Sequence, residues 1–190
     1  MPGLTFGGLT CMLLAIVYLR LAVARLVCAG LLFVAGPALA LEQYTGHGGP
    51  VKHLTLSPDG GLMVSASFDY SAVVWTVPDM ADTATLIGHD AAVNVAAFSP
   101  DGNWLVTGGD DNQILLWSVD DIRKNRDKAA PFLLAGHRGK IVDFTFSSDG
   151  RHLASASWDG FVGVWDMALA RNQLDQMPYM LHGHDGPVNM

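Results

Sequence analysis

Three segments of the sequence each carry a histidine, a hydroxyl-bearing residue and an aspartate at the same spacing. An imidazole, a hydroxyl and a carboxylate are the side chains of a Ser-His-Asp hydrolytic triad, in which the histidine takes the hydroxyl proton. Three near-identical copies argue against that chemistry, because an enzyme needs one active site whereas a repeat needs the same residues in every unit. The three sets are His47, Ser65 and Asp69; His89, Thr107 and Asp111; and His137, Ser155 and Asp159.

Other catalytic and cofactor chemistries find no support in the residues present. Both cysteines, Cys11 and Cys28, lie in the first forty residues, so the remainder has no thiol for a disulfide, a Cys-ligated zinc or a thioether-linked haem. His182 and His184 form a candidate metal pair, but His184 belongs to a repeat and no acidic or cysteine cluster accompanies His182. The glycines occupy repeat turns and not a phosphate loop. We therefore expect no catalytic residue, no metal and no cofactor.

The composition is that of a folded domain, and it argues against nucleic-acid binding. The 190 residues are 50% hydrophobic, and 11 Lys and Arg stand against 18 Asp and Glu, for a net charge of -7. That length and apolar content suffice for one ordinary domain. Binding to phosphate backbones requires clustered Lys and Arg, so we expect no nucleic-acid partner.

The triad-like residues recur because the chain is built from repeats. Gly-His pairs end at His47, His89, His137 and His184, and Trp75, Trp117 and Trp165 each follow the first three histidines by 28 residues. Between them, short alternating apolar runs are separated by SPDG, SPDG and SSDG turns, which predicts strands joined by hairpins. In the first unit the strands are expected at about 51–56, 62–66, 71–75 and 84–87. After the leader, only 167–174 shows a possible helical pattern.

These units resemble the WD-repeat β-propeller family, in which each repeat carries Gly-His near its start and Trp-Asp near its end. Trp165 is followed by Asp166, while Trp75 and Trp117 are followed by other residues. The resemblance implies an all-β propeller of four-stranded antiparallel blades. It also implies that a buried hydrogen-bond relay, and no catalytic site, occupies each unit. The relay members would be His47, Ser65, Asp69 and Trp75; His89, Thr107, Asp111 and Trp117; and His137, Ser155, Asp159 and Trp165.

The expected ring is incomplete. Units at about 46–87, 88–135 and 136–182 form three complete blades, and 183–190 begins a fourth. Residues 41–45 resemble the outer strand that precedes each Gly-His pair. Because a propeller closes on itself, we expect a truncated sequence or fragment, with two half-rings pairing or an open piece as the alternatives. Open blade edges would allow self-association.

The first forty residues are expected to form a signal peptide. Arg20 and Arg25 precede an apolar run at 26–35, a Gly-Pro breaker and Ala38-Leu39-Ala40, so cleavage is expected after Ala40. The alternative is a membrane anchor over 9–34, which would place both arginines near its centre. Cleavage would leave 41–190, with nine basic and 18 acidic residues, as an exported bacterial protein in the periplasm.

Two surfaces are candidates for partner binding. The residue before each relay aspartate, Phe68, Asp110 or Trp158, lies at a turn tip, where exposed aromatic side chains dominate interface energetics. Packing on the neighbouring blade is the alternative. At the other end, the insertion at 119–128 is either a solvated loop or a basic patch for an acidic partner. Its candidate residues are Arg123, Lys124, Arg126, Lys128 and nearby Arg138.

The sequence therefore favours a non-catalytic scaffold of the periplasm that binds other proteins. The alternative is the propeller portion of a larger exported enzyme or electron-transfer protein, for example one with a c-type haem domain beyond residue 190. Propellers support both binding and catalysis, so fold alone does not separate these functions.

Overall fold

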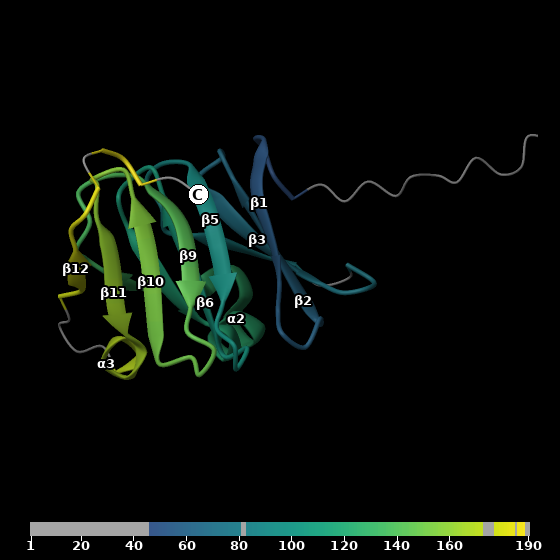
Figure 1. Ribbon diagram of the computed structural model, residues 1–190. Helices are drawn as coiled ribbons and strands as arrows, with labels where there is room; N and C mark the ends of the chain where they lie inside the picture. The colour runs from purple at the N-terminus through teal and green to yellow at the C-terminus, as the bar shows by residue number, and fades with distance from the viewer. Residues whose placement is uncertain (1–45, 81–82, 173–176, 185, 189–190) are drawn as a thin grey trace, which may run out of the picture. The chain divides into compact units, whose positions relative to one another are not determined.

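Three four-stranded antiparallel sheets follow one another along the chain in the computed structural model, which describes residues 46–80, 83–172, 177–184 and 186–188 (Figure 1). Within each sheet the strands lie side by side in sequence order, so each sheet is a meander of three hairpin connections. The expected all-β class with four-stranded antiparallel blades is confirmed. The predicted signal peptide at 1–40 and the predicted outer strand at 41–45 lie outside the described residues.

We name the sheets blades 1, 2 and 3 in chain order. Blade 1 contains β1 (Val51–Leu56), β2 (Leu62–Ser67), β3 (Ser71–Thr76) and β4 (Thr83–Ile87). Blade 2 contains β5 (Val93–Phe98), β6 (Trp104–Gly109), β7 (Ile114–Ser118) and β8 (Phe132–Leu134). Blade 3 contains β9 (Ile141–Phe146), β10 (His152–Ser157), β11 (Val162–Asp166) and β12 (Tyr179–Leu181).

The first hairpin of each blade is closed by the repeated Asp-Gly turn. In blade 1, the Leu62 amide donates to Ser57 Oγ at 2.9 Å, and the Gly60 amide donates to the Ser57 carbonyl at 2.9 Å. Gly60 has a φ of 71°, a left-handed conformation that glycine adopts without a Cβ clash. Gly102 and Gly150 occupy the same turn with φ of 70° and 68°. The two SPDG turns and the SSDG turn therefore give the three hairpins the same register.

Apolar residues of adjacent blades pack face to face and form two cores. The first strands β1, β5 and β9 are neighbours (Figure 1), so successive sheets stack around this common edge. The first core joins blade 1 residues such as Val64 and Val74 to Val93 and Phe98 of blade 2. The second joins blades 2 and 3 and includes Ile141. Burial between blades, at about 25 cal/mol per Å² of apolar area, stabilises this arrangement.

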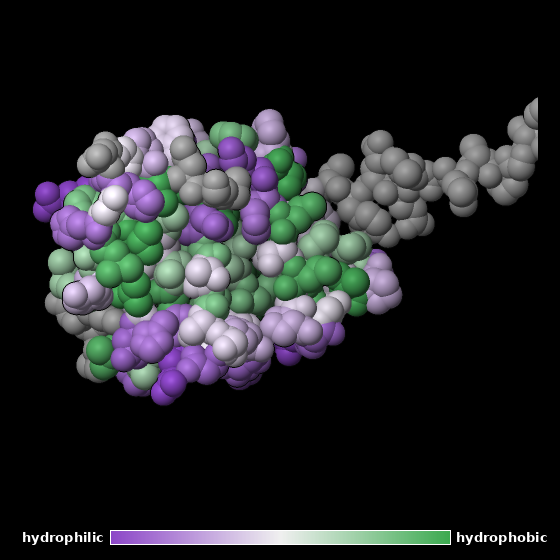
Figure 2. Space-filling view, viewed as in Figure 1, coloured by the Kyte–Doolittle hydropathy of each residue, from purple (hydrophilic) through white to green (hydrophobic). Residues whose placement is uncertain are grey.

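The two outer faces of this stack expose positions that are buried elsewhere in the repeat. Leu54 and Leu56 of β1 are each 58% exposed, whereas Ala96 and Phe98 at the same positions of β5 are 1% and 9% exposed. On blade 3, the apolar residues equivalent to buried residues of blade 1 are only half-buried, namely Ala154, Ala156, Val162 and Val164. Figure 2 shows this side as an apolar band across the middle of the strands, between polar turns. Positions that are buried between neighbouring blades are thus partly open to solvent on the two outer faces.

The insertion at 119–128 is helical, so the expected loop conformation is wrong, although residues 123–128 are exposed to solvent. It forms α2 (Val119–Asn125) and the 3-10 turn η2 (Arg126–Lys128). Ser118 caps α2 by accepting from the Asp121 amide, and Val119 and Ile122, three residues apart, are buried. Asp127 accepts a hydrogen bond of 2.6 Å from the Thr85 amide, so the insertion holds β4 of the preceding blade.

A second short helix, α3 (Met167–Arg171), begins at the residue where the helical pattern was expected. Asp166 caps it by accepting from the Ala168 amide, and Arg171 reaches the Gly150 carbonyl of the SSDG turn at 3.3 Å. In the described ranges, no helix has both the length and the apolar character to span a bilayer.

Candidate functional site

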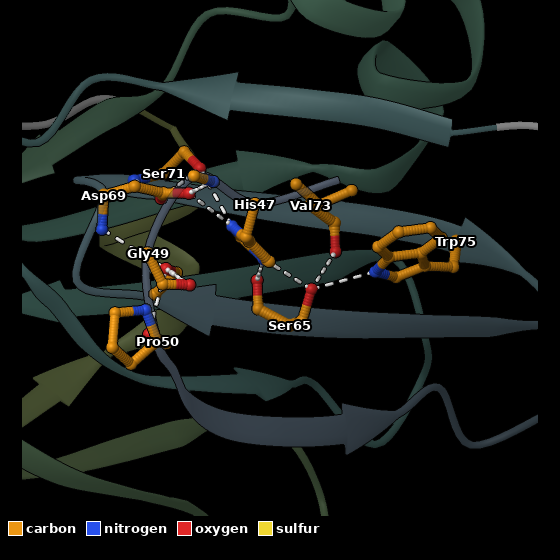
Figure 3. A network of polar contacts seen from close by, with 10 residues as sticks. His47, Gly49, Pro50, Ser65, Asp69, Ser71, Val73 and Trp75 are labelled. Carbon is orange, nitrogen blue, oxygen red and sulfur yellow. Dashed lines mark hydrogen bonds and ion pairs between the residues drawn. The ribbon is translucent and has the colours of Figure 1, made fainter. Parts of the chain in front are cut away.

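A hydrogen-bond network crosses blade 1 from the β2–β3 turn to the core (Figure 3). His47 lies before β1, Ser65 in the middle of β2, Asp69 in the β2–β3 turn and Trp75 at the end of β3. His47 Nδ1 lies 2.9 Å from Asp69 Oδ2 and its Nε2 lies 2.7 Å from Ser65 Oγ. Trp75 Nε1 donates to the same Ser65 Oγ at 2.8 Å. The four side chains thus form one continuous chain of contacts.

The other two blades repeat this geometry closely. In blade 2, His89 lies 2.9 Å from Asp111 and 2.8 Å from Thr107 Oγ1, which accepts from Trp117 Nε1 at 3.0 Å. In blade 3, His137 lies 2.8 Å from Asp159 and 2.7 Å from Ser155 Oγ. Trp165 Nε1 donates to Ser155 Oγ at 2.9 Å. The structure therefore brings together all twelve residues in three sets of four.

The donors and acceptors of each network run in one direction. The indole of Trp75 only donates and an ionised Asp69 only accepts, so the hydroxyl of Ser65 donates to His47 Nε2 and Nδ1–H donates to Asp69. This polarity matches a hydrolytic triad, but the hydroxyls are inaccessible. Ser65, Thr107 and Ser155 are 3%, 0% and 1% exposed, and each hydroxyl oxygen already accepts from an indole. A substrate cannot reach these oxygens in the folded blade.

The carboxylate of each network also holds the turn that carries it. Burial raises the pKa of Asp69, but hydrogen bonds from Ser71, the Gly48 amide and His47 outweigh burial and hold that pKa below its usual range. Burial likewise raises the pKa of Asp159, and the Arg138 amide and His137 reverse the effect. In blade 2, burial lowers the pKa of His89, with the charge of Asp111 opposing it.

The residue before each network aspartate lies at the tip of the β2–β3, β6–β7 or β10–β11 turn. The Phe68 amide donates to the Pro50 carbonyl at 3.0 Å, and the amides of Asp110 and Trp158 make the equivalent bonds. These bonds fix the three tips against the start of the first strand in each blade. Phe68 and Trp158 are 45% and 49% exposed, whereas Asp110 is half-buried.

A bulge in the first strand of each blade turns a second residue toward the same place. The pairing of β1 with β2 runs from Val51 directly to His53, so Lys52 is an extra residue. Asn94 in β5 and Val142 in β9 are skipped in the same way. A bulge re-aims a side chain and recurs beside binding sites. Sequence reasoning missed these three residues, although they lie at one repeat position, five residues after the histidine.

The tip residues and the bulge residues converge on one pocket of about 450 Å³. Each blade supplies one residue of each kind, and β1 and the loop before β9 add His53 and Lys140. Residues that are 90 positions apart in the sequence therefore face one cavity. Its lining is Lys52, His53, Phe68, Asn94, Asp110, Lys140, Val142 and Trp158.

Ionic contacts and contacts between lysines and aromatic rings hold the side chains that line the pocket. Lys140 Nζ lies 2.6 Å from Asp110 Oδ2 and 5.3 Å from the centre of the Trp158 ring. Lys52 Nζ lies 5.7 Å from the centre of the Phe68 ring. Burial raises the pKa of Asp110, but hydrogen bonds from Lys140 and Asn94 and the charge of Lys52 hold it below its usual range. Burial lowers the pKa of His53, against the charge of Asp143.

Comparison with known protein families identifies the repeats. The profile of the WD domain, G-beta repeat matches residues 40–76, 81–118 and 131–166. This chain belongs to the WD40-repeat family. The three matches correspond to the three units that the Gly-His and Trp positions define.

Relatives of this WD40 chain include longer fungal proteins. The ribosome biogenesis protein ytm1 of Pyrenophora tritici-repentis is 32% identical over 130 residues, which are 67% of this chain and 27% of that protein. The guanine nucleotide-binding protein subunit beta of Saccharomyces cerevisiae is 42% identical over 53 residues, which are 27% of this chain and 12% of that protein. The chain thus spans about a quarter or less of these relatives.

A solved structure shares the WD40 architecture. The structure of U3-55K superposes with a TM-score of 0.65 and 26% sequence identity, covering 76% of this chain and 42% of that chain. The arrangement of consecutive four-stranded sheets is therefore similar in both.

The five basic candidates do not form one patch on these WD40 blades. Arg123 lies 3.8 Å from Asp59 of a neighbouring SPDG turn, and Lys124 pairs with Asp120. Arg138 lies at the opposite end, where its amide donates to Asp159, because Gly-His links and SPDG turns occupy opposite ends of a meander. The expected grouping of Arg138 with the insertion is wrong. Arg126 and Lys128 are exposed in the η2 turn.

The candidate metal pair shows a different arrangement. The ring of His182 packs edge-on against Phe161, with centroids 4.5 Å apart, and His184 is exposed. Among the described residues, no group of three or more His, Cys, Asp or Glu side chains is placed to hold a metal ion.

Proposed function

We propose that this WD40 segment is a non-catalytic module that binds another protein at the pocket where its blades meet. One observation carries the proposal: two positions of every repeat, the turn tip and the bulge, direct their side chains into a single cavity. The positions of the hydrogen-bond networks carry chemically similar residues in the three blades. The pocket positions differ in each blade, which gives the site a defined chemical pattern.

The composition of the pocket supports a protein partner. Half-exposed Phe68 and Trp158 provide large aromatic surfaces, the kind that carries most of the free energy in protein interfaces. Lys140, Asp110 and Asn94 hold one another by hydrogen bonds, so the floor of the pocket is ordered before a partner arrives. Such preorganisation reduces the entropy lost on binding.

Photo-crosslinking from two positions in the cells that make this protein tests the proposal. A photo-reactive phenylalanine analogue replaces Phe68 at the pocket or Arg151, an exposed residue beside the SSDG turn at the other end. We expect a crosslinked polypeptide from position 68 and none from position 151. Crosslinks from position 151 alone, or equal crosslinks from both, would place binding elsewhere.

The compartment is a separate proposal. We propose that the module acts after export, in a bacterial periplasm, and the support for this is the leader at 1–40 with its basic residues, apolar run and Ala-Leu-Ala end. N-terminal sequencing of the protein from a periplasmic fraction should begin at Leu41. A cytoplasmic protein that begins at Met1 would refute export.

A further inference from the structure

We propose that the pocket selects an acidic peptide segment in which a carboxylate side chain neighbours an aromatic or aliphatic one. This inference rests on the proposed function and specifies its ligand. The groups of the pocket that attract a cation, two aromatic rings and a carboxylate, already contact lysines of this chain. The ammonium groups of Lys140 and Lys52 lie over the rings of Trp158 and Phe68, and Lys140 also holds Asp110.

Occupied cation sites disfavour a basic partner. A lysine or arginine from a ligand would seek the ring faces and the Asp110 carboxylate, the groups that attract cations. Asp110 Oδ2 already accepts from Lys140, and its Oδ1 accepts from Asn94 Nδ2 at 2.7 Å. Asn94 is fixed in turn by a second bond of 3.0 Å to the Ile141 carbonyl. A basic ligand would therefore have to break contacts before making its own.

The donors that remain favour an anion. An ammonium group has three N–H donors, and Lys140 commits one of them to Asp110. Among the residues that the structure describes, no carboxylate lies within 4 Å of Lys52. The pocket lining thus contains two lysines against one aspartate, a local excess of positive charge within a chain of net charge -7. A carboxylate placed between the lysines would be steered there and held.

The apolar part of the ligand follows from the same lining. Phe68 and Trp158 are half-exposed on blades 1 and 3, and Val142 also lines the pocket. Their ring edges and the valine can cover an aromatic or aliphatic side chain beside the carboxylate. Single-stranded RNA, which also combines negative charge with stacking bases, is disfavoured because the two lysines of the lining can meet one carboxylate but not the successive phosphates of a nucleic-acid backbone, which require clustered Lys and Arg.

Peptide selection with the full chain tests the inference and separates it from the proposed function. A random twelve-residue phage library is selected on the immobilised chain and counter-screened on Trp158→Ala. We expect enriched peptides that require Trp158 and contain Asp or Glu next to Phe, Tyr, Trp or Leu. Peptides that require Trp158 but are basic or uncharged would overturn the inference and leave the proposed function intact. Peptides that ignore Trp158, or no enrichment, would count against both.

A charge variant checks the assigned role of Lys52. Lys52→Met keeps the aliphatic stem over Phe68 and removes the ammonium, so it should weaken a selected acidic peptide about five-fold in fluorescence polarisation. Arg151→Met removes one positive charge at the opposite end and should change affinity less than two-fold, roughly the cost of a screened surface charge. Equal weakening by both variants, or tighter binding of a labelled oligouridine than of the peptide, would contradict the inference.

Discussion

The hydrogen-bond networks and the pocket lie within a few residues of each other but follow opposite rules. The network positions carry a histidine, a hydroxyl, an aspartate and a tryptophan in every blade, and their hydroxyls and indoles are buried. The pocket positions carry Phe68, Asp110 and Trp158 at the tips and a different trio at the bulges. Repetition therefore marks residues that hold a blade, while variation at a fixed repeat position marks the residues of the proposed binding site.

Neighbouring residues show the contrast most sharply. Asp111 accepts from His89 and from the Asp90 amide inside its blade. Asp110, one position earlier, accepts from Lys140 and Asn94 across the pocket. Asp110 and Asp111 are adjacent in the sequence but have different roles, because the side chains of successive residues at a turn tip point in different directions.

Trp117→Ala should give the largest loss of stability. Trp117 is 1% exposed and donates to Thr107 Oγ1, so its removal leaves a cavity and a buried hydroxyl oxygen that has lost its donor, and we expect a loss of about 3 to 5 kcal/mol in urea unfolding. Trp158→Ala is the matched control, because Trp158 is 49% exposed. It should cost about 1 kcal/mol or less. Equal losses for both would remove the distinction between network and pocket.

Asp111→Ala should be the next most damaging substitution. It leaves the Nδ1–H of His89 and the Asp90 amide without their acceptor, which we expect to cost about 2 to 3 kcal/mol of unfolding free energy. Asp110→Ala, its neighbour, removes contacts that are only partly buried and should cost about 1 kcal/mol or less. The same chemical denaturation measures both. A reversed order would show that Asp110 belongs to the architecture.

Acid should weaken the networks in two stages. Because burial lowers the pKa of folded His89 below 6.5, the unfolded chain takes up the proton first. The contribution of neutral His89 is therefore complete above pH 6.5 and is lost as pH falls through the folded pKa. Asp69 and Asp159 have folded pKa values below 3.8, so their contributions are lost at still lower pH. Urea unfolding between pH 8 and 3 should show the first stage and the onset of the second, and His89→Asn should lack the first.

Phe68→Ala should have the smallest effect on stability and a clear effect on binding. Its ring is 45% exposed and contacts Lys52, so we expect a change of about 0.5 kcal/mol in unfolding free energy. The affinity for a peptide selected on the pocket should fall about ten-fold, as for an aromatic interface residue. Unfolding of this variant under conditions where Trp158→Ala is folded would assign Phe68 to the core.

Most of the fold could be read from the sequence because local signals agree with one another. The four strands expected in the first unit lie within one residue of their observed bounds. The resemblance to WD repeats also implied that His47, Ser65 and Asp69 belong to one relay, and the structure joins these three side chains. Turn chemistry, alternation and repeat spacing each depend on nearby residues, so no tertiary information is needed.

The missed features depend on contacts between strands or blades. Lys52, Asn94 and Val142 reach the pocket because of bulges, which are irregularities of pairing that no single strand reveals. The helix α2 forms where Val119 and Ile122 find an apolar surface to bury against, and its charged residues hid that signal. Its Ser118 cap and the three-residue spacing of Val119 and Ile122 were the available clues.

The central claim is tested most directly by the indole N–H signals of ¹⁵N-labelled protein during titration with a selected acidic peptide. The networks contain Trp75, Trp117 and Trp165, whereas Trp158 lines the pocket. We predict that the Trp158 signal shifts on binding and that the three network signals stay in place. Shifts in the network signals with an unchanged Trp158 signal would contradict the division between repeated architecture and variable recognition.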